Sequence, residues 1–427
     1  MIANKKENIT YILFITLMLV TIGLRVKLQG FADDLYFTHA LDGWKFSDYV
    51  FARYRTWSGR LVLDGLMLST INIHPVWRVG IPLSVLVLCI SISKLAAGKV
   101  DLKVVALSLC AYLLIPKEIL DNSSWWITGF YNYLLPVSAM LYSLSVLVRS
   151  YQHNVISKMA AIACLALSCF NEQTAIFTVI AAIIMLALNS KLRGIFGYFY
   201  IAVSVAFSLI LFMAPGNIKR FGIESWRWFP EFQHEHLMYK VLLGIDRLHG
   251  ALVTHNALNL CALSVLSIIL IRRQSYKGIA QSAVTLILAA QVIIFFALRI
   301  KLFKLGFSFY NENFLNTEMA TSYSRYLSYL MSMMVIVSVC YSLAVSSLKD
   351  SSFLVPLCAI IISCATVVMI GFSPTVYASG MRVLFLCEVI ISASCVFIFY
   401  KMYGSEGNAS RHVTAFAAVM CLLNFSI

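Results

Sequence analysis

Two adjacent carboxylates follow the first apolar run of this chain, and they are its first candidate for acid–base chemistry. Asp33 and Asp34 stand side by side in the segment FADDLYF. Neighbouring carboxylates repel each other, which raises the pKa of one of them and suits it to removing a proton from a hydroxyl. A solvated loop start explains the same pair, so both interpretations stay open at this point.

Arginines recur where apolar runs meet polar segments, and they could bind an anion. A single arginine in such a place is ordinary, because its long side chain reaches from the apolar phase to water. Several on one side of a membrane are more specific, since the guanidinium fork matches a phosphate group. The candidates for binding a phosphate are Arg60, Arg220, Arg325 and Arg382.

Aromatic and polar residues in three segments could hold a sugar. Trp126 lies in SWWITGFYNY, where it fits either sugar stacking or an interfacial aromatic belt. Asn171 and Glu172 interrupt an apolar hairpin, and Glu172 could cap the next helix or bind a substrate hydroxyl. Tyr377 lies in SPTVYASGMR. These four residues are the candidates for sugar and acceptor binding.

Metal and nucleotide motifs are missing from the sequence. His234, Glu235 and His236 do not form the HExxH zinc motif, because position 238 is Met. The eleven cysteines lie in apolar runs without a CxxC spacing, which favours a packing role. No P-loop or GxGxxG is present. We therefore expect no cofactor, and leave a divalent ion near Asp33 and Asp34 open.

The composition indicates what must position these residues. The 427-residue chain is 60% hydrophobic and 12% charged, against about 25% charged in soluble domains. Its apolar runs approach the roughly 20 residues that cross a bilayer as a helix. The sequence therefore predicts an all-α polytopic membrane protein, one integral domain over 1–427 with about 11–13 transmembrane helices. The predicted spans are 10–28, 79–96, 104–118, 131–149, 156–170, 174–189, 195–214, 249–271, 279–298, 327–347, 353–371, 383–401 and 413–425.

Lysine and arginine density predicts the orientation of these spans. The net charge of +14 comes from basic residues placed singly or in pairs between apolar runs, which argues against nucleic-acid binding. The shorter loops are denser in Lys and Arg and are placed in the cytoplasm. The long segments 29–78, 215–248 and 299–326 then face the other side, the periplasm in a bacterium. Segment 29–78 has helical apolar spacing, which is typical of interfacial amphipathic helices.

Seven segments of the chain together resemble a known family. The segments are FADDLYF, WSGR, SWWITGFYNYLLP, NEQTAIF, APGNIKR, SRYLSYL and SPTVYASGMR. In this order they resemble the phage-type serotype-converting O-antigen glucosyltransferases, which are bacterial inner-membrane enzymes of GT-C architecture. The resemblance runs from the first span to about residue 382.

The resemblance implies a reaction and a set of partners. Such enzymes move a glucosyl or other hexosyl group from undecaprenyl phosphate to a lipid-linked O-antigen acceptor on the periplasmic face, with inversion. A carboxylate after the first span acts as the base, here Asp34 by preference or Asp33. The arginines would stabilise the leaving phosphate, and a donor synthase and a small flippase would be the functional partners.

Three other functions remain as alternatives. An O-antigen polymerase would carry its large periplasmic loop late in the chain, whereas the acid-rich loop comes first here. A transporter or flippase of lipid-linked sugars would carry ionisable residues within its spans, and Glu388 is the main one. A membrane acyltransferase would need a histidine within a span, and none lies clearly mid-span.

Overall fold

The computed structural model describes residues 2–253, 258–274, 278–299 and 323–404. All regular elements in these residues are helices, and no strand occurs among them, which confirms the all-α prediction. Eight of these helices are long and apolar enough to cross a membrane: Glu7–Arg25, His74–Ala97, Ile127–Leu147, Ile195–Phe212, Ile279–Ala297, Tyr329–Ser347, Ser351–Phe372 and Met381–Tyr403. The chain therefore has the architecture of a multi-pass membrane protein.

Shorter apolar helices account for most of the other predicted spans. They are Leu102–Leu113, Val155–Ser168, Glu172–Leu188 and Leu258–Arg272, and a further short apolar helix, Leu61–Thr70, lies within the predicted loop 29–78. The predicted span 249–271 is wrong as one helix, because two helices cover it, α14 (Leu237–Val253) and α15 (Leu258–Arg272). The polar sequence Thr254-His255-Asn256 stands between them. The predicted span 413–425 lies outside the described residues.

The chain divides into two compact units. Unit 1 consists of Met1–Leu109, Glu118–Gln233 and Gly380–Leu386, and unit 2 of Cys110–Lys117, His234–Ser379 and Cys387–Ile427. Three helices contribute residues to both units: α6 (Leu102–Leu113), α7 (Lys117–Leu120) and α19 (Phe385–Tyr403).

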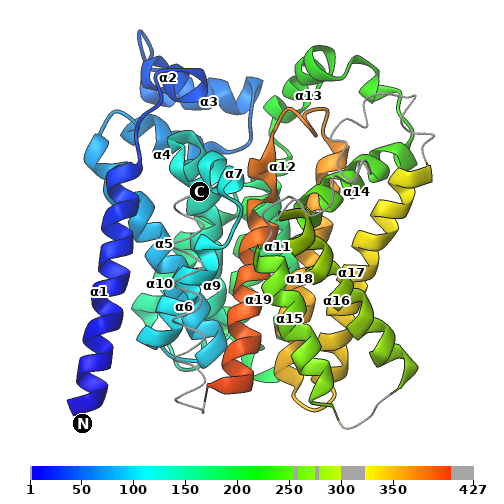
Figure 1. The fold of residues 1–427 in the computed structure, drawn as a ribbon. Helices are drawn as coiled ribbons and strands as arrows, with labels where there is room; N and C mark the ends of the chain where they lie inside the picture. The colour runs from blue at the N-terminus through cyan, green and yellow to red at the C-terminus, as the bar shows by residue number, and fades with distance from the viewer. Residues whose placement is uncertain (1, 254–257, 275–277, 300–322, 405–427) are drawn as a thin grey trace. The chain divides into compact units, whose positions relative to one another are not determined.

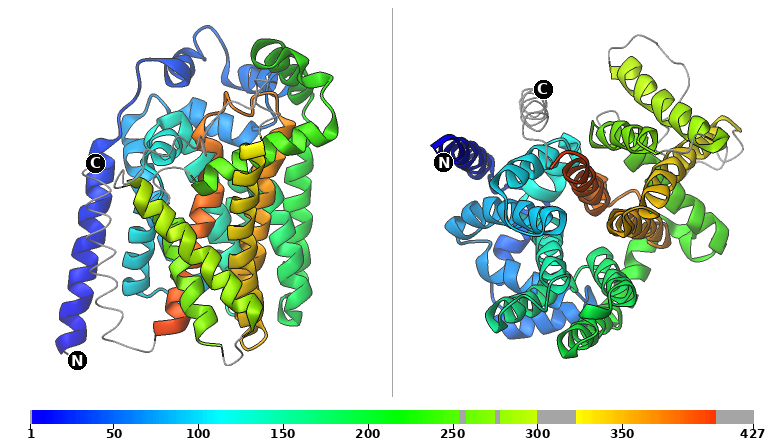
Figure 2. Two further views of the ribbon diagram at one scale, coloured as in Figure 1. Left: turned by 45° about the vertical axis from the view of Figure 1, so that its right-hand side comes forward. Right: turned by 90° about the horizontal axis from the view of Figure 1, so that it is seen from below.

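Unit 1 is a helix bundle with short helices gathered at one end. Its helices are α1 (Ile2–Arg25), α2 (Ala32–His39), α3 (Phe46–Thr56), α4 (Leu61–Thr70), α5 (His74–Ala97), α8 (Ile127–Gly129), α9 (Leu135–Leu147), α10 (Val155–Ser168), α11 (Glu172–Leu188), α12 (Ile195–Phe212) and α13 (Pro215–Trp228). Helix α5 packs against α1 and α9, and α9 packs against α10. Helices α2, α3, α4 and α13 lie at one end of this bundle (Figures 1 and 2).

Small residues let the central helix of unit 1 pack on several sides. Nearly every residue of α9 is buried, among them Ser138, Ala139, Ser143 and Ser145. Short side chains allow helix backbones to approach closely in a membrane, where apolar burial alone gives little preference for a partner helix. Two π-helical turns, η1 (Asp121–Trp125) and η2 (Phe130–Leu134), precede α9. Such turns occur frequently at functional sites.

Unit 2 is built on α14 (Leu237–Val253), α15 (Leu258–Arg272), α16 (Ile279–Arg299), α17 (Tyr323–Ser347), α18 (Leu354–Val368) and most of α19. Helix α15 packs against α16 and α17, and α14 packs against α18 and the turn η7 (Met369–Phe372). This last contact is close because glycines meet there: a Cβ on Gly371 would lie 2.1 Å from the Lys240 carbonyl oxygen.

Candidate functional site

The Asp33–Asp34 pair lies in the first turn of α2, and its two carboxylates have different surroundings. Asp34 is fully buried. Its Oδ1 accepts hydrogen bonds from the Thr128 amide at 2.9 Å and hydroxyl at 2.6 Å, and its Oδ2 accepts one from the Gln29 amide at 3.1 Å. Asp33 is exposed. Asp34 therefore fastens α2 to α8, and Asp33 is the carboxylate of the pair that is open to solvent.

The backbone just before this pair is strained. Ala32 has φ of +54°, a left-handed conformation that glycine adopts freely but that L residues other than asparagine and aspartate rarely adopt. Such a conformation costs about 1–3 kcal/mol and persists only where the surroundings enforce it. The three hydrogen bonds that Asp34 accepts hold the chain in place two residues after Ala32, and we infer that they enforce this conformation.

Arg60, Glu172 and Arg220 form an ionic cluster in unit 1. Arg60 holds the Glu172 carboxylate with two guanidinium nitrogens, Nε at 3.0 Å and Nη2 at 2.7 Å from Oε2. Arg220 Nη2 lies 3.7 Å from Glu172 Oε1. The three side chains are 20%, 22% and 30% exposed, in the order Arg60, Glu172 and Arg220. The polar residues that interrupt the apolar hairpin at 171–173 thus include the acid at the centre of this cluster, Glu172.

The charges of this cluster are fixed at neutral pH. Burial raises the pKa of the Glu172 carboxyl, but Arg60 and Arg220 outweigh it and bring that pKa to about 2. Burial lowers the pKa of Arg60, and Glu172 more than offsets this, so the guanidinium stays protonated. Two cations and one anion leave a net charge of +1, which favours an anionic ligand.

Asn132 connects the ionic cluster to Asp34. Its Oδ1 accepts a hydrogen bond from Arg60 Nη1 at 2.8 Å, and its Nδ2 donates to the Thr128 carbonyl at 2.9 Å. Asn171 Nδ2 donates to the Asn132 carbonyl at 2.9 Å. A continuous path of contacts therefore joins Asp34, Thr128, Asn132, Arg60, Glu172 and Arg220.

Asn171 also starts the helix that carries Glu172. Its Oδ1 accepts from the amides of Gln173 and Thr174, at 3.1 and 3.2 Å, which satisfies amides at the start of α11. The residue predicted as a sugar contact is thus a helix cap, and Glu172 occupies the first helical position. Glu172 was predicted to cap a helix or bind a hydroxyl. In the structure its carboxylate forms ion pairs with Arg60 and Arg220.

Close backbone contacts bring the segments WSGR and APGNIKR together. Asn217 Oδ1 accepts from the Gly59 amide at 3.1 Å, and its Nδ2 donates to the Leu211 carbonyl at 2.7 Å. A Cβ on Gly216 would lie 2.4 Å from the Trp57 amide nitrogen. Only glycine fits there, and Pro215 suits the first position of α13. These contacts place Arg60 beside Arg220.

Trp126 and Arg382 form a second pair within unit 1. The Arg382 guanidinium lies 5.1 Å from the centre of the Trp126 ring, as a cation–π contact. Arg382 lies in the short helix η8 (Met381–Leu384), which packs against η1 and follows Gly380 with φ of +62°. Buried Trp126 Nε1 and Arg382 Nε have no hydrogen-bond partner among the described residues.

Two predicted residues belong to unit 2. Tyr377 donates its hydroxyl to Asp246 Oδ2 at 2.6 Å, and Tyr329 donates to Oδ1 of the same carboxylate. Burial and the Asp246 carboxylate raise the pKa of Tyr377, so its phenol is protonated at neutral pH. Arg325 lies in the first turn of α17, and its side chain is outside the described part of the structure.

Sequence reasoning missed three residues of these arrangements. Asn132 and Thr128 lie in a segment that was singled out for its tryptophans, and Asp246 lies in a predicted loop. A polar residue within an otherwise apolar helix was the available signal for Asn132. Among the described residues, no group of three or more His, Cys, Asp or Glu side chains is arranged to hold a metal ion.

Comparison with known proteins gives no match: no family model, no curated protein and no solved structure is similar to this chain.

Proposed function

We propose that this protein is a glycosyltransferase that moves a glucosyl or other hexosyl group from a polyprenyl phosphate to a hydroxyl of O-antigen or a related surface polysaccharide. The observation that carries the proposal is the contact path from Asp34 to Arg220. It gathers an acid pair and two arginines from distant segments within unit 1. An acid beside cations at the end of a membrane bundle is what transfer from a lipid phosphate requires.

The reaction needs no nucleotide and no covalent intermediate. The acceptor hydroxyl oxygen attacks the anomeric carbon, the bond from that carbon to the phosphate oxygen breaks, and the configuration inverts. The hydroxyl proton passes to a carboxylate, and the polyprenyl phosphate leaves as an anion. Fixed cations around that anion stabilise the transition state without having to reorganise.

We assign the base to Asp33 and a positioning role to Asp34, which differs from the preference for Asp34 in the sequence. A base must come within hydrogen-bond reach of the proton it removes. The Asp34 carboxylate is fully buried and already accepts three hydrogen bonds. Asp33 is exposed on the same turn of α2. A positioned general base contributes about 10²–10⁴-fold to such a rate.

The setting of this reaction follows from the resemblance and from the membrane architecture. The protein would lie in a bacterial inner membrane with unit 1 offering its short helices α2, α3, α4 and α13 to the periplasm, in a GT-C architecture. Undecaprenyl-phosphate sugar and lipid-linked O-antigen would be its substrates. A donor synthase and a small flippase would supply the donor to that face.

Transfer can be measured with purified protein, undecaprenyl-phosphate glucose and a lipid-linked acceptor. Wild-type protein should form glucosylated acceptor, and the double variant Asp33→Asn/Asp34→Asn should form none while its expression is unchanged. Full activity of the double variant would overturn the assignment of the base. Unchanged O-antigen in cells that express the protein with a donor synthase would overturn the function.

A transporter or flippase of lipid-linked sugars is the second candidate, and Glu388 favours it. This residue is fully buried within α19, and Asn259 Nδ2 donates to its Oε2 at 2.5 Å. Acids within membrane spans often belong to proton or substrate pathways. A flippase would move a fluorescent lipid-linked sugar across vesicles, and Glu388→Gln should stop that movement. A transferase would leave the lipid in its leaflet.

A further inference from the structure

The arginines of unit 1 differ in whether a carboxylate accompanies them. Arg53 is paired with Asp64 at 3.0 Å, and Arg60 and Arg220 are paired with Glu172. Arg382 is half-buried and forms no ion pair with any described residue. A partly buried cation without a counter-charge is costly. Its surroundings therefore suit an anion that the chain itself does not supply.

The neighbouring indole has a matching unused donor. Trp126 is 7% exposed, and its Nε1–H has no acceptor among the described residues. Arg382 Nε–H is buried and without an acceptor in the same part of the structure. An unsatisfied buried donor destabilises the protein, and more so when it is charged. The two donors belong to side chains in contact, since the guanidinium lies 5.1 Å from the ring centre.

The chemistry of these donors selects the ligand. An indole N–H and a guanidinium can only donate hydrogen bonds, so the ligand must accept at least two. The positive charge of Arg382 favours an acceptor that is anionic. A phosphoryl group offers several charged oxygens, and the guanidinium fork matches its geometry.

We propose that Trp126 and Arg382 form an oxyanion subsite that binds one phosphoryl group through the indole N–H and the guanidinium Nε–H. This deepens the proposed function, because it distinguishes the arginine that receives a substrate phosphate from those that shape the site. Arg60 and Arg220 belong to the second kind, since Glu172 already engages both. The subsite can bind phosphate whether or not the protein transfers a sugar.

Binding can be measured on detergent-solubilised full-length protein by calorimetry with three probes: inorganic phosphate, farnesyl phosphate and farnesol. Trp126→Phe retains the ring but removes the N–H, and we expect it to weaken phosphate binding about tenfold. Arg382→Gln removes the charge as well, and we expect about a hundredfold loss. Preference for farnesyl phosphate over inorganic phosphate would identify a lipid head group, and equal binding would identify a free phosphoryl group.

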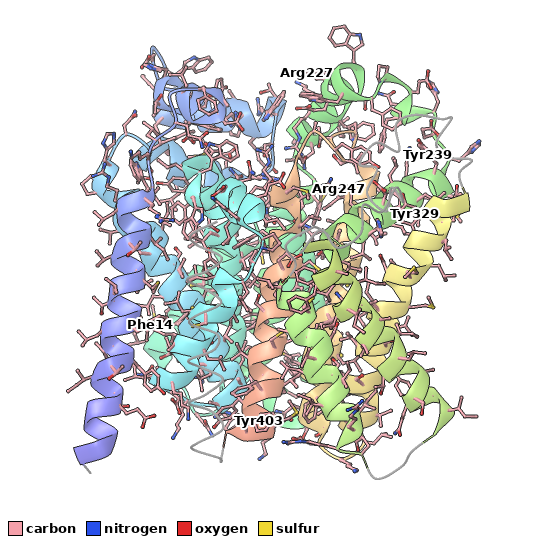
Figure 3. The ribbon with its side chains drawn as sticks, in the orientation of Figure 1. Phe14, Arg227, Tyr239, Arg247, Tyr329 and Tyr403 are labelled. Carbon is pink, nitrogen blue, oxygen red and sulfur yellow. The ribbon has the colours of Figure 1, made fainter. Side chains whose placement is uncertain are left out.

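Unit 1 offers a matched control pair. Arg227 lies on α13 (Figure 3), and its guanidinium is 5.0 Å from the centre of the Trp228 ring. Both residues are exposed. Trp228→Phe and Arg227→Gln make the same chemical changes in a cation–π pair that lacks buried unsatisfied donors. Both should bind farnesyl phosphate as the wild type does. Equal losses at the two pairs would show a general effect of surface charge and would overturn the subsite.

A second measurement follows ligand binding on the wild-type protein and needs a variant only to assign one resonance. The seven tryptophans labelled with ¹⁵N at the indole give separate resonances, and Trp126→Phe identifies the one that belongs to Trp126. Farnesyl phosphate should shift that indole proton downfield, as a new hydrogen bond to an anion does, and farnesol should not. No shift under saturating farnesyl phosphate, or unchanged affinity in both Trp126→Phe and Arg382→Gln, would overturn the proposal.

Discussion

Two arginine environments in unit 1 differ in how far the protein satisfies them. In the Arg60–Glu172–Arg220 cluster, Arg60 donates hydrogen bonds to Glu172 and Asn132. In the Trp126–Arg382 pair, the guanidinium makes a cation–π contact with the indole ring, and two buried N–H groups have no acceptor among the described residues. Arginines that all lie where an apolar run meets a polar segment can therefore have different roles. The first set holds the structure together and keeps a net positive charge near the acid pair, whereas the second has hydrogen-bond donors available to a ligand.

Removing the anion of the ionic cluster should have the largest effect on stability. Glu172→Ala leaves Arg60 largely buried without its counter-charge, which costs about 3 kcal/mol. Thermal unfolding in detergent should show the loss. Arg382→Ala is the matched variant, and it should change stability by about 1 kcal/mol or less, because it removes a cation–π contact but no ion pair or hydrogen bond. Equal destabilisation by the two variants would remove the distinction between the environments.

Breaking the connection through Asn132 should have the next largest effect. Asn132→Leu removes the acceptor of Arg60 Nη1 and the donor to the Thr128 carbonyl, and we expect a loss of about 1–3 kcal/mol. Asn132→Asp keeps an acceptor for Arg60 but cancels the net charge of the cluster. It should therefore weaken binding of an anionic donor, raising KM more than it lowers kcat. A variant in which neither stability nor KM changes would contradict the role of Asn132.

The pH dependence of stability should give the smallest effect, and its sign is fixed by Glu172. The pKa of this carboxyl is about 2 in the folded protein, below the ordinary value of about 4.3 in an unfolded chain. A depressed pKa stabilises the fold above the unfolded value, and the contribution disappears as pH falls through the folded value. The difference in unfolding temperature between wild type and Glu172→Gln should be constant from pH 7 to 5. It should then shrink between pH 4.3 and 2, and a difference that grows there would contradict the ion pairing.

The sequence was sufficient to predict the helical membrane architecture. Apolar runs near the length of a span must form helices in lipid, because only the helix satisfies their backbone hydrogen bonds there. It was also sufficient to find Asp34, Arg60 and Glu172, whose charges stand out beside apolar runs. It marked Asn132 only as a polar residue in an apolar helix, and it could not reveal the role of Asn132, which depends on its three partners Arg60, Thr128 and Asn171. Nor could it separate α14 from α15, since hydrophobicity continues across Val253 and Leu258 with only a short polar interruption.

The distinction between Asp33 and Asp34 was likewise beyond the sequence. Adjacent residues on a helix point in directions about 100° apart, so one can be buried while the other is exposed. Which one is buried depends on Thr128, 94 positions away from Asp34 along the chain. Contacts over such separations follow from packing, which the local pattern of residues does not contain.

The most direct test of the account is the rate of sugar transfer by single variants of the first loop. We would compare Asp33→Asn, Asp34→Asn and the control Asp48→Asn, which alters an exposed aspartate in the first turn of α3. The account predicts that Asp33→Asn lowers kcat about 10²-fold or more with an unchanged unfolding temperature. Asp34→Asn should lower the unfolding temperature, and Asp48→Asn should change neither quantity. Wild-type kcat in Asp33→Asn would contradict the central claim that this acid is the base of a sugar transfer.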